Sequence, residues 1–481
     1  MQKFINIEKK PHLHQILVIL ICLAPLSANA GLLLKLYQQA LDTNPTLLGK
    51  TYAIDRANAQ KDQAFSRLLP QVSATGSYSL NRFNQQTNGT QIDGSAVNYD
   101  GLRGTVMARQ ALFDLPSYMR YQGAKAATEQ TEQELEAYRM ELAGEVLDRY
   151  LQVLEASDQI AYVISEKEAT NSQIEQLREM QQRQMAKITD LYEAEAYYQT
   201  LNTLEIEAKN KKAVGLEQLR ETTGMSLDEV TPLSKEQFPP VPENLDKWVQ
   251  DAIRNNPNLA ALQYAIESAS KLISGSKAEH LPKLDLQLLE TYSDQGYDNR
   301  QLPAYDVASA NLQLTIPIYE GGRVNAATSE AVARQQMAKQ QYNETRRKIE
   351  LETRTSFLNA AASRARIAST GQEVEAQNKS YEAQATGYEL GVSTIVDVLN
   401  NRKLLFKARV DQLQARYDYN RNLIALRIWT GGLSIADIEE IDAWFTPDSG
   451  EQAPQDFLQK PKGNESGYSK KPVASMQQSG S

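Results

Sequence analysis

The chain of 481 residues contains one cysteine and three histidines, and this scarcity argues against several kinds of functional site. Cys22, His12 and His14 lie within the first thirty residues, so His280 is the only histidine in the rest of the chain. A histidine-based metal site or a Cys/His catalytic pair needs more of these side chains than the rest of the chain provides. The G-x-x-x-x-G-K-[ST] and G-x-G-x-x-G patterns of nucleotide sites do not occur either. We therefore expect no enzyme, no metal and no cofactor.

Positive charge is also in short supply, because 51 Lys and Arg residues stand against 60 Asp and Glu residues, a formal net charge of -9. Binding to nucleic acid depends on basic side chains that neutralise phosphates. The acidic balance therefore argues against nucleic acid as a partner.

No hydrophobic run in the sequence is long enough for a membrane-spanning helix. The apolar stretch at residues 16–26 has 11 residues, whereas a spanning helix needs about 20. It follows Lys9 and Lys10 and precedes Ala28-Asn29-Ala30, a small-residue cleavage pattern. We expect residues 1–30 to be a signal peptide and Gly31 to begin the exported protein. Lipid attachment at Cys22 is not expected, because a large residue precedes this cysteine.

Proline is absent from two long stretches, residues 117–231 and 318–446, which are rich in helix-forming residues. The second stretch offers a break at Gly391, and the equivalent position in the first is Gln184. We expect long helices at residues 117–183 and 324–390, each about 100 Å long at 1.5 Å per residue. Return helices are expected at residues 188–223 and 394–429.

The two stretches belong to an internal duplication, which predicts two similar structural units. Identical residues recur at a spacing of 212 and, further along, at a spacing of 207. The pairs at the first spacing are Ala40/Ala252, Asn44/Asn256, Pro45/Pro257, Tyr52/Tyr264, Ala53/Ala265, Ile54/Ile266, Leu69/Leu281 and Pro70/Pro282. Those at the second are Ile160/Ile367, Asp190/Asp397, Leu219/Leu426, Arg220/Arg427 and Gly224/Gly431.

Each copy also carries a pair of segments in which apolar and polar residues alternate, the pattern of a two-faced β-strand. We expect β-hairpins at about residues 71–112 and 283–318. Strands of this length with one apolar face suit a membrane-spanning barrel, although a half-buried soluble sheet would show the same alternation. Two hairpins give four strands, fewer than the roughly eight of the smallest barrels, so closure needs several chains.

The chain thus divides into a first repeat at residues 31–224, a second at residues 245–446, an extended connector at 225–244 and a disordered tail at 447–481. The fold class is mainly α with a membrane β-barrel. The alternative is a soluble periplasmic coiled-coil adaptor or scaffold, in which the strands form a small sheet.

One stretch of the second repeat is especially distinctive: residues 388–399, with the sequence Tyr-Glu-Leu-Gly-Val-Ser-Thr-Ile-Val-Asp-Val-Leu. It resembles the second inter-helix turn of the TolC-like outer-membrane efflux protein family. Asn44-Pro45, Asn256-Pro257, residues 316–322 and Thr430-Gly431 add to the resemblance, which covers about residues 32–445.

This resemblance implies a homotrimer with a twelve-stranded barrel in the bacterial outer membrane and a tunnel of twelve helices across the periplasm. It implies two further partners, an inner-membrane ABC or proton-driven pump and a periplasmic adaptor protein. Type I protein secretion and small-molecule efflux both use such ducts. The missing lipid-attachment cysteine favours the secretion branch.

The resemblance also places a periplasmic gate and docking tips at the turns between the long helices. The expected gate residues are Asp397, Tyr388, Asn400, Ser393 and Asp190. The expected docking residues are Gly391, Val392, Gln184 and Met185. Asp397 lies at capping-box spacing from Thr394, so it has two possible roles, in the pore and in the cap. Tyr388 could hold the gate or simply pack between helices, and Asp190 could act as a gate residue or as a local helix cap.

Two departures from the family pattern matter for the gate. Its best-known members carry an arginine and a second aspartate where this chain has Ser393 and Asn400. The acidic ring is therefore expected to be thinner, and the family's ion-pair latch cannot be copied. In the first repeat, Gln184 replaces the glycine of the turn.

Overall fold

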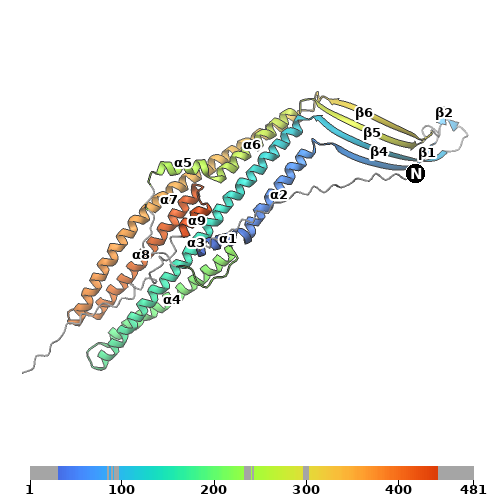
Figure 1. Cartoon of the computed structure of the whole chain (residues 1–481). Helices are drawn as coiled ribbons and strands as arrows, with labels where there is room; N and C mark the ends of the chain where they lie inside the picture. Colours follow the sequence, from blue (N-terminus) through green and yellow to red (C-terminus); the bar gives the residue numbers. More distant parts are fainter. Residues whose placement is uncertain are drawn as a thin grey trace, which may run out of the picture.

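The computed structural model describes residues 31–442 except 84–85, 88–89, 92–96, 232–239, 241–242 and 296–302. The expected signal peptide, half of the connector and the tail lie outside the described residues. The described chain forms an elongated molecule with a β-sheet at one end and two pairs of long helices that reach the other end (Figure 1).

The helices form two matching sets. The first repeat contributes α1 (Leu32–Thr43), α2 (Pro45–Ser66), α3 (Leu115–Gln182) and α4 (Ile188–Thr223). The second contributes α5 (Leu245–Asn255), α6 (Pro257–Ala278), α7 (Arg323–Glu389) and α8 (Ile395–Trp429), and α9 (Ile435–Asp442) follows. The helices α3 and α7 have 68 and 67 residues. The short helices α1, α5 and α9 were not expected as separate elements.

An Asn-Pro pair begins the second helix of each repeat. Asn44 accepts backbone N–H groups at the start of α2, and Asn256 does the same at the start of α6. The amide groups of both residues also reach the ends of the return helices: Asn44 donates to the carbonyl of Thr222 at 3.3 Å, and Asn256 donates to the carbonyl of Trp429 at 3.0 Å. The duplicated residues therefore make the same joint twice.

The long helices change neighbours along their length. Near the sheet, α3 packs against α2 and α6, and α6 packs against α7. Toward the far end, α3 pairs with α4 and α7 pairs with α8, while α8 also contacts α3 (Figure 1). The largest hydrophobic core joins α1, α3, α8 and α9, and it includes the fully buried Leu33, Tyr150, Tyr417 and Tyr419. None of the described helices is both long and apolar enough to cross a membrane.

The sheet contains four antiparallel strands in the order β1 (Gln71–Phe83), β4 (Val97–Phe113), β5 (Lys283–Gln295) and β6 (Tyr305–Thr315). Two short strands, β2 (Gln86–Thr87) and β3 (Thr90–Gln91), pair between β1 and β4 in the sequence. The β4–β5 pairing joins the two repeats. The expected strand end at residue 318 is too late, since β6 stops at Thr315, just before Pro317, which has no N–H to donate.

Candidate functional site

The sheet has one apolar face that is exposed in the single chain. Directly paired residues lie on the same face, so the register defines rows across the four strands. Val72, which is 71% exposed, begins one such row. Two neighbouring rows consist of Val72, Ala108, Leu288 and Ala310, and of Ala74, Val106, Glu290 and Ala308. Glu290 is the charged exception in these two rows.

The opposite face of the sheet is polar, and its side chains bond across the strands. Asp285 and Thr291 are buried on this face. The cross-strand links are Arg109 to Asp285 at 2.8 Å, Thr105 to Thr291 at 3.3 Å and Gln287 to Gln313 at 2.6 Å. An apolar face and a polar, hydrogen-bonded face are what a barrel wall between lipid and water requires.

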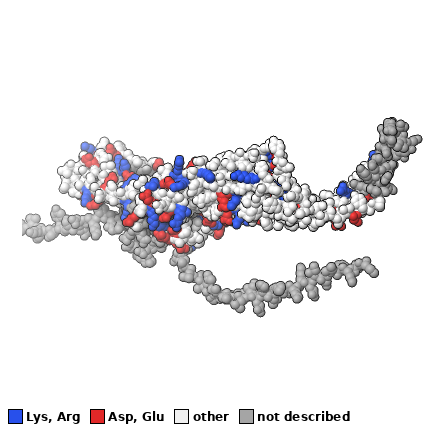
Figure 2. All heavy atoms as spheres, turned by 90° about the horizontal axis from the view of Figure 1, so that it is seen from above, with Lys and Arg blue, Asp and Glu red and all other residues white. Residues whose placement is uncertain are grey.

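Charged residues are distributed unequally between the helical end of the molecule and the sheet (Figure 2). On the face shown in Figure 2, Lys, Arg, Asp and Glu gather over the helices, and most of the described sheet is free of them. Burying charge in hydrocarbon is costly, whereas the helices can keep their charges in water.

The turn between α7 and α8 is built around Gly391, whose φ of 76° is left-handed. The N–H of Val392 donates to the carbonyl of Gly387 at 2.8 Å, which is the helix-ending pattern that favours glycine. Val392, the residue after Gly391, is 80% exposed.

The turn between α3 and α4 repeats this geometry without a glycine. Gln184 has a φ of 62°, and the N–H of Met185 donates to the carbonyl of Met180 at 2.8 Å. Met185 is 69% exposed, like its counterpart in the other turn. The two turns therefore differ in sequence at Gln184 but share one backbone conformation, which a non-glycine residue adopts at a cost.

The structure places Asp397 in a capping box at the start of α8. Its carboxylate accepts the backbone N–H of Thr394 at 3.0 Å and the Thr394 hydroxyl at 2.6 Å. These hydrogen bonds, first from the hydroxyl and then from the backbone, lower the pKa of the Asp397 carboxyl. The residue is also exposed, so the cap leaves its charge in contact with solvent.

The other expected gate residues lie near this turn. Tyr388 on α7 is half-buried against a hydrophobic cluster that joins α3, α4 and α8, and Asn400 is exposed on α8. Burial raises the pKa of the Tyr388 hydroxyl, and the negative charge of Asp190 on α4 raises it further. Ser393 is half-buried beside Gly387, where an added side-chain carbon would overlap its hydroxyl. The structure thus brings Tyr388 and Asp190 from different helix pairs within electrostatic reach.

A buried ion pair that the sequence analysis missed connects the two helix pairs. Arg402 on α8 donates to Glu166 on α3 at 2.6 Å, and each side chain is only 9% exposed. Tyr197 donates to the same carboxylate at 3.2 Å, and Arg402 donates to Gln173 at 3.3 Å. Burial raises the pKa of Glu166, and the Arg402 guanidinium partly offsets this effect.

Further polar contacts continue along the same α3–α8 seam. Tyr417 donates to Asp158 at 2.7 Å, and Arg421 donates to Glu155 at 2.6 Å and to Asp148 at 3.2 Å. Burial raises the pKa of Asp158. The seam is therefore held by specific charged and hydrogen-bonded partners as well as by apolar packing.

A sequence signal for the buried pair does exist. Glu166 stands three residues after Val163 and eight before Ile174, which places it on the buried stripe of α3. Arg402 occupies the same kind of position between Leu399 and Leu405 on α8. A charge on a helix stripe that is otherwise apolar indicates a buried partner.

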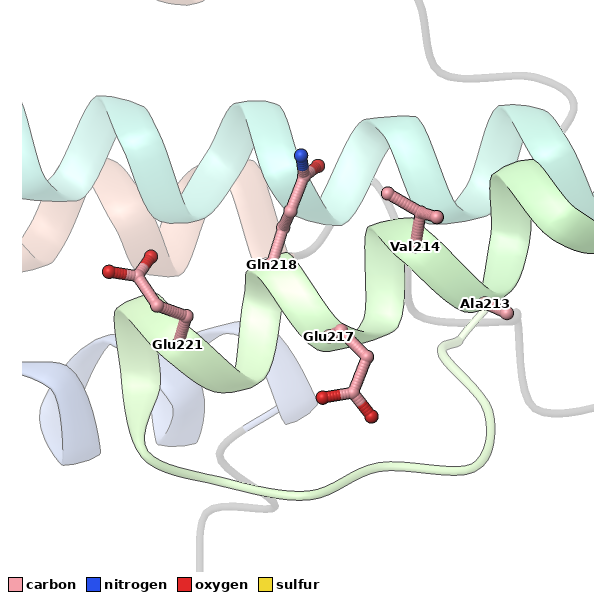
Figure 3. Close-up of a pocket in the computed structure, with 5 residues that line it drawn as sticks. All are labelled: Ala213, Val214, Glu217, Gln218 and Glu221. Carbon is pink, nitrogen blue, oxygen red and sulfur yellow. The ribbon is translucent and has the colours of Figure 1, made fainter.

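One pocket among the described residues has a lining that does not suit a small ligand. This shallow pocket is lined by Ala213, Val214, Glu217, Gln218 and Glu221, all from α4 (Figure 3). Ligand sites usually converge from several elements, and this pocket does not. Within the described part of the chain, no group of three or more His, Cys, Asp or Glu side chains could hold a metal ion.

Comparison with known proteins shows which proteins share this architecture. The model of the family described as outer membrane efflux protein matches residues 36–225 and 248–432. The chain is similar to outer membrane protein TolC of Vibrio cholerae, with 27% identity over 416 residues, 85% of this chain and 93% of the relative. It is equally similar to the alkaline protease secretion protein AprF of Pseudomonas aeruginosa, with 27% identity over 419 residues, 85% of this chain and 86% of the relative.

Solved structures share the fold at lower sequence identity. A structure of CusC aligns with a TM-score of 0.75 and 17% identity, over 83% of this chain and 92% of that one. The outer membrane protein VceC of Vibrio cholerae aligns with a TM-score of 0.73 and 18% identity, over 83% and 96% of the two chains.

Proposed function

Since this chain belongs to the outer membrane efflux protein family, we propose that three copies of it form the outer-membrane duct of an export system. The sheets close into one barrel in the membrane, and the helices continue as a tunnel into the periplasm. The duct is passive, because an inner-membrane ABC or proton-driven pump supplies the energy and a periplasmic adaptor joins the pump to the duct.

The open four-stranded sheet is the observation that carries this proposal. Its edge strands, β1 and β6, each pair on one side only within the described sheet. Because the strand number is even and all pairs are antiparallel, the two edges run in opposite directions. The β6 edge of one copy can therefore pair antiparallel with β1 of the next. Three copies, the number that the resemblance implies, give twelve strands.

The two faces of the sheet fit this arrangement. The apolar face turns toward lipid, and the polar face with its bonds between Arg109 and Asp285 and between Gln287 and Gln313 turns toward the water-filled interior. This arrangement places the protein in the outer membrane with a large periplasmic part. It does not favour the alternative of a soluble periplasmic adaptor, which would leave the exposed apolar face without a partner.

The gate lies at the far tips of the helices. We assign its closed state to the contact of the α7–α8 pair with α3 and α4. Two interactions hold this contact together, the Glu166–Arg402 ion pair and the electrostatic interaction between Tyr388 and Asp190. Opening then requires α8 to move away from α3. Three copies of Asp397 surround the entrance and favour cations there, while Ser393 and Asn400 leave the ring less acidic.

The same tips form the docking site for the adaptor protein. One turn contains Gln184 and Met185, and the other contains Gly391 and Val392. Each subunit therefore presents two similar turns, each with an exposed apolar residue. Three subunits would present six such turns, which suits an adaptor that binds a repeated surface.

Secreted protein is the proposed cargo class, by the type I route. Relatives named as protease secretion proteins, AprF and PrtF, align over 85% and 89% of this chain. A relative named for pyoverdine export matches at 23% identity, so small-molecule efflux is the competing cargo.

The proposal is tested by purification in detergent, followed by mass measurement and by conductance in planar bilayers. A trimer that opens a conductance supports it. A monomer, or a trimer that never conducts, contradicts it. Carbonate washing of membranes separates the alternative, because a soluble adaptor is released and a barrel is retained.

A further inference from the structure

The first described residue and the last described residue meet in the middle of the molecule. Asp442 ends α9 and is only 7% exposed. Its carboxylate accepts the backbone N–H groups of Leu33 and Gly31, at the start of α1. A side-chain carbon added at Gly31 would overlap this carboxylate, so a larger residue there would displace Asp442 from the contact.

This contact coincides with the cleavage site expected from the sequence. Hydrolysis of the Ala30–Gly31 peptide bond adds one water molecule, giving a carboxylate on Ala30 and an amine on Gly31. The amine takes up a proton at neutral pH, since an α-amino group has a pKa of about 8. The nitrogen that donates one neutral N–H to Asp442 before cleavage becomes an ammonium group with three donors.

We propose that Asp442 is the receptor for the α-ammonium group of Gly31, and that removal of residues 1–30 forms an ion pair that locks α1 against α9. The lock is absent before cleavage, because an amide nitrogen carries no charge. It is a consequence of processing and does not depend on the proposed duct function.

The surroundings of Asp442 favour a cation at this point. Burial raises the pKa of the Asp442 carboxyl, which means that its charge is costly in this position, and the two backbone N–H groups offset that cost only in part. Its negative charge also reaches Tyr150, the pKa of which is raised to about 12, chiefly by burial. A charge-assisted bond from an ammonium group is stronger than one from a neutral amide.

The lock would act on a core that both ends of the described chain share. Leu33 and Leu36 of α1 and Ile438 and Ile441 of α9 belong to one hydrophobic cluster, together with Tyr150 of α3. Fixing α1 to α9 therefore stabilises the middle of the molecule, where the long helices change neighbours.

The test compares four proteins made in the exporting cell and purified in detergent. Two begin at Gly31, with Asp442 or with Asp442→Asn. Two carry an insertion of Ala-Gly between Ala30 and Gly31, again with Asp442 or with Asp442→Asn. Mass spectrometry first identifies the amino terminus of each, and hydrogen exchange of the α1 amides then measures local opening.

The ion pair predicts that the insertion and Asp442→Asn each speed α1 exchange by about tenfold, and that the combination is no faster than either alone. It also predicts that the Gly31 amine resists acylation at neutral pH and becomes reactive in Asp442→Asn. The control is Asp437→Asn, which removes the carboxylate that accepts from Ser434 at 2.8 Å at the other end of α9. This change should add to the insertion without coupling.

Two results would overturn the proposal. One is a mature protein that begins at a residue other than Gly31. The other is an insertion that leaves α1 exchange unchanged while Asp442→Asn speeds it, because Asp442 would then act only as a cap for α1.

Discussion

Replacing Arg402 with methionine tests whether the buried ion pair holds the duct closed. The change removes the cation but keeps a long, flexible side chain that can fill the same space. Glu166 then stays buried on α3, where Tyr197 still donates to its carboxylate. The expected result is a channel that opens more often.

The burial of the ion pair sets an upper limit to the free-energy change. Both side chains are 9% exposed, so the pair is buried. Removing one partner of a buried pair typically costs about 3–5 kcal/mol. If about 1.4 kcal/mol of that is lost from the closed state alone, the closed-to-open ratio falls about tenfold in each subunit. The double replacement Glu166→Met with Arg402→Met removes the unpaired charge and should recover folding stability while the gate stays loose.

Single-channel recording in planar bilayers measures the open fraction, and thermal unfolding of the same samples measures stability. The matched control is Lys167→Met, one position along α3. Lys167 pairs with Glu205 on α4, inside a single helix pair, so its loss should leave the open fraction unchanged. If Arg402→Met lowers stability and the open fraction stays at the wild-type value, the pair is structural and the gate assignment is wrong.

Three further changes test the turns and joints. Gln184→Gly should stabilise the α3–α4 turn by about 1 kcal/mol, since it relieves a left-handed φ of 62°; slower amide exchange at this turn is the readout. Asn256→Ala should cost about 1–2 kcal/mol by removing a helix cap and the bond to Trp429, and denaturant unfolding compares it with Asn258→Ala. Folding lowers the pKa of Asp397. The stabilisation by the cap is therefore fully present above the pKa of the unfolded chain, about 3.9, and is lost as the pH falls through the lower pKa of the folded state. The difference in α8 amide exchange between wild type and Asp397→Asn should therefore vanish at low pH; a difference that persists there would contradict the cap.

Much of the architecture could be predicted from periodicity and punctuation. Proline-free runs indicate the long helices, and alternation indicates the strands, because both are local consequences of backbone geometry. The short helix α1 was missed because Asn44-Pro45 indicates only that a helix starts there. In the structure the same asparagine also ends α1. The end of β6 was placed too late, because the alternation continues to Ile318 although Pro317 cannot join the ladder.

The candidate site was harder to predict, because its contacts join residues far apart in the sequence. Glu166 and Arg402 are 236 positions apart, and only the packing of α8 against α3 brings them together. Conversely, Gln184 suggested that the first turn differs from the second, whereas the backbone there has the same left-handed conformation as Gly391. A non-glycine residue can be tolerated where glycine is preferred, so two turns with different sequences can have the same backbone conformation.

The central claim is that sheets from different copies close into one barrel, and engineered disulfides test it directly. The chain has no cysteine outside residues 1–30, so the disulfides of newly introduced cysteine pairs can be detected without interference from native cysteines in the rest of the chain. Within one chain, β1 and β6 are separated by β4 and β5, about 14 Å at 4.8 Å per strand, beyond the reach of a disulfide at about 7 Å. Cysteines at Val72 or Ala74 on β1, combined with cysteines at Ala308, Ala310 or Leu312 on β6, are oxidised in membranes and separated on denaturing gels. The account predicts that at least one pair gives covalent dimers and trimers and nothing larger. Monomers from every pair, or a ladder that continues beyond the trimer, would contradict it.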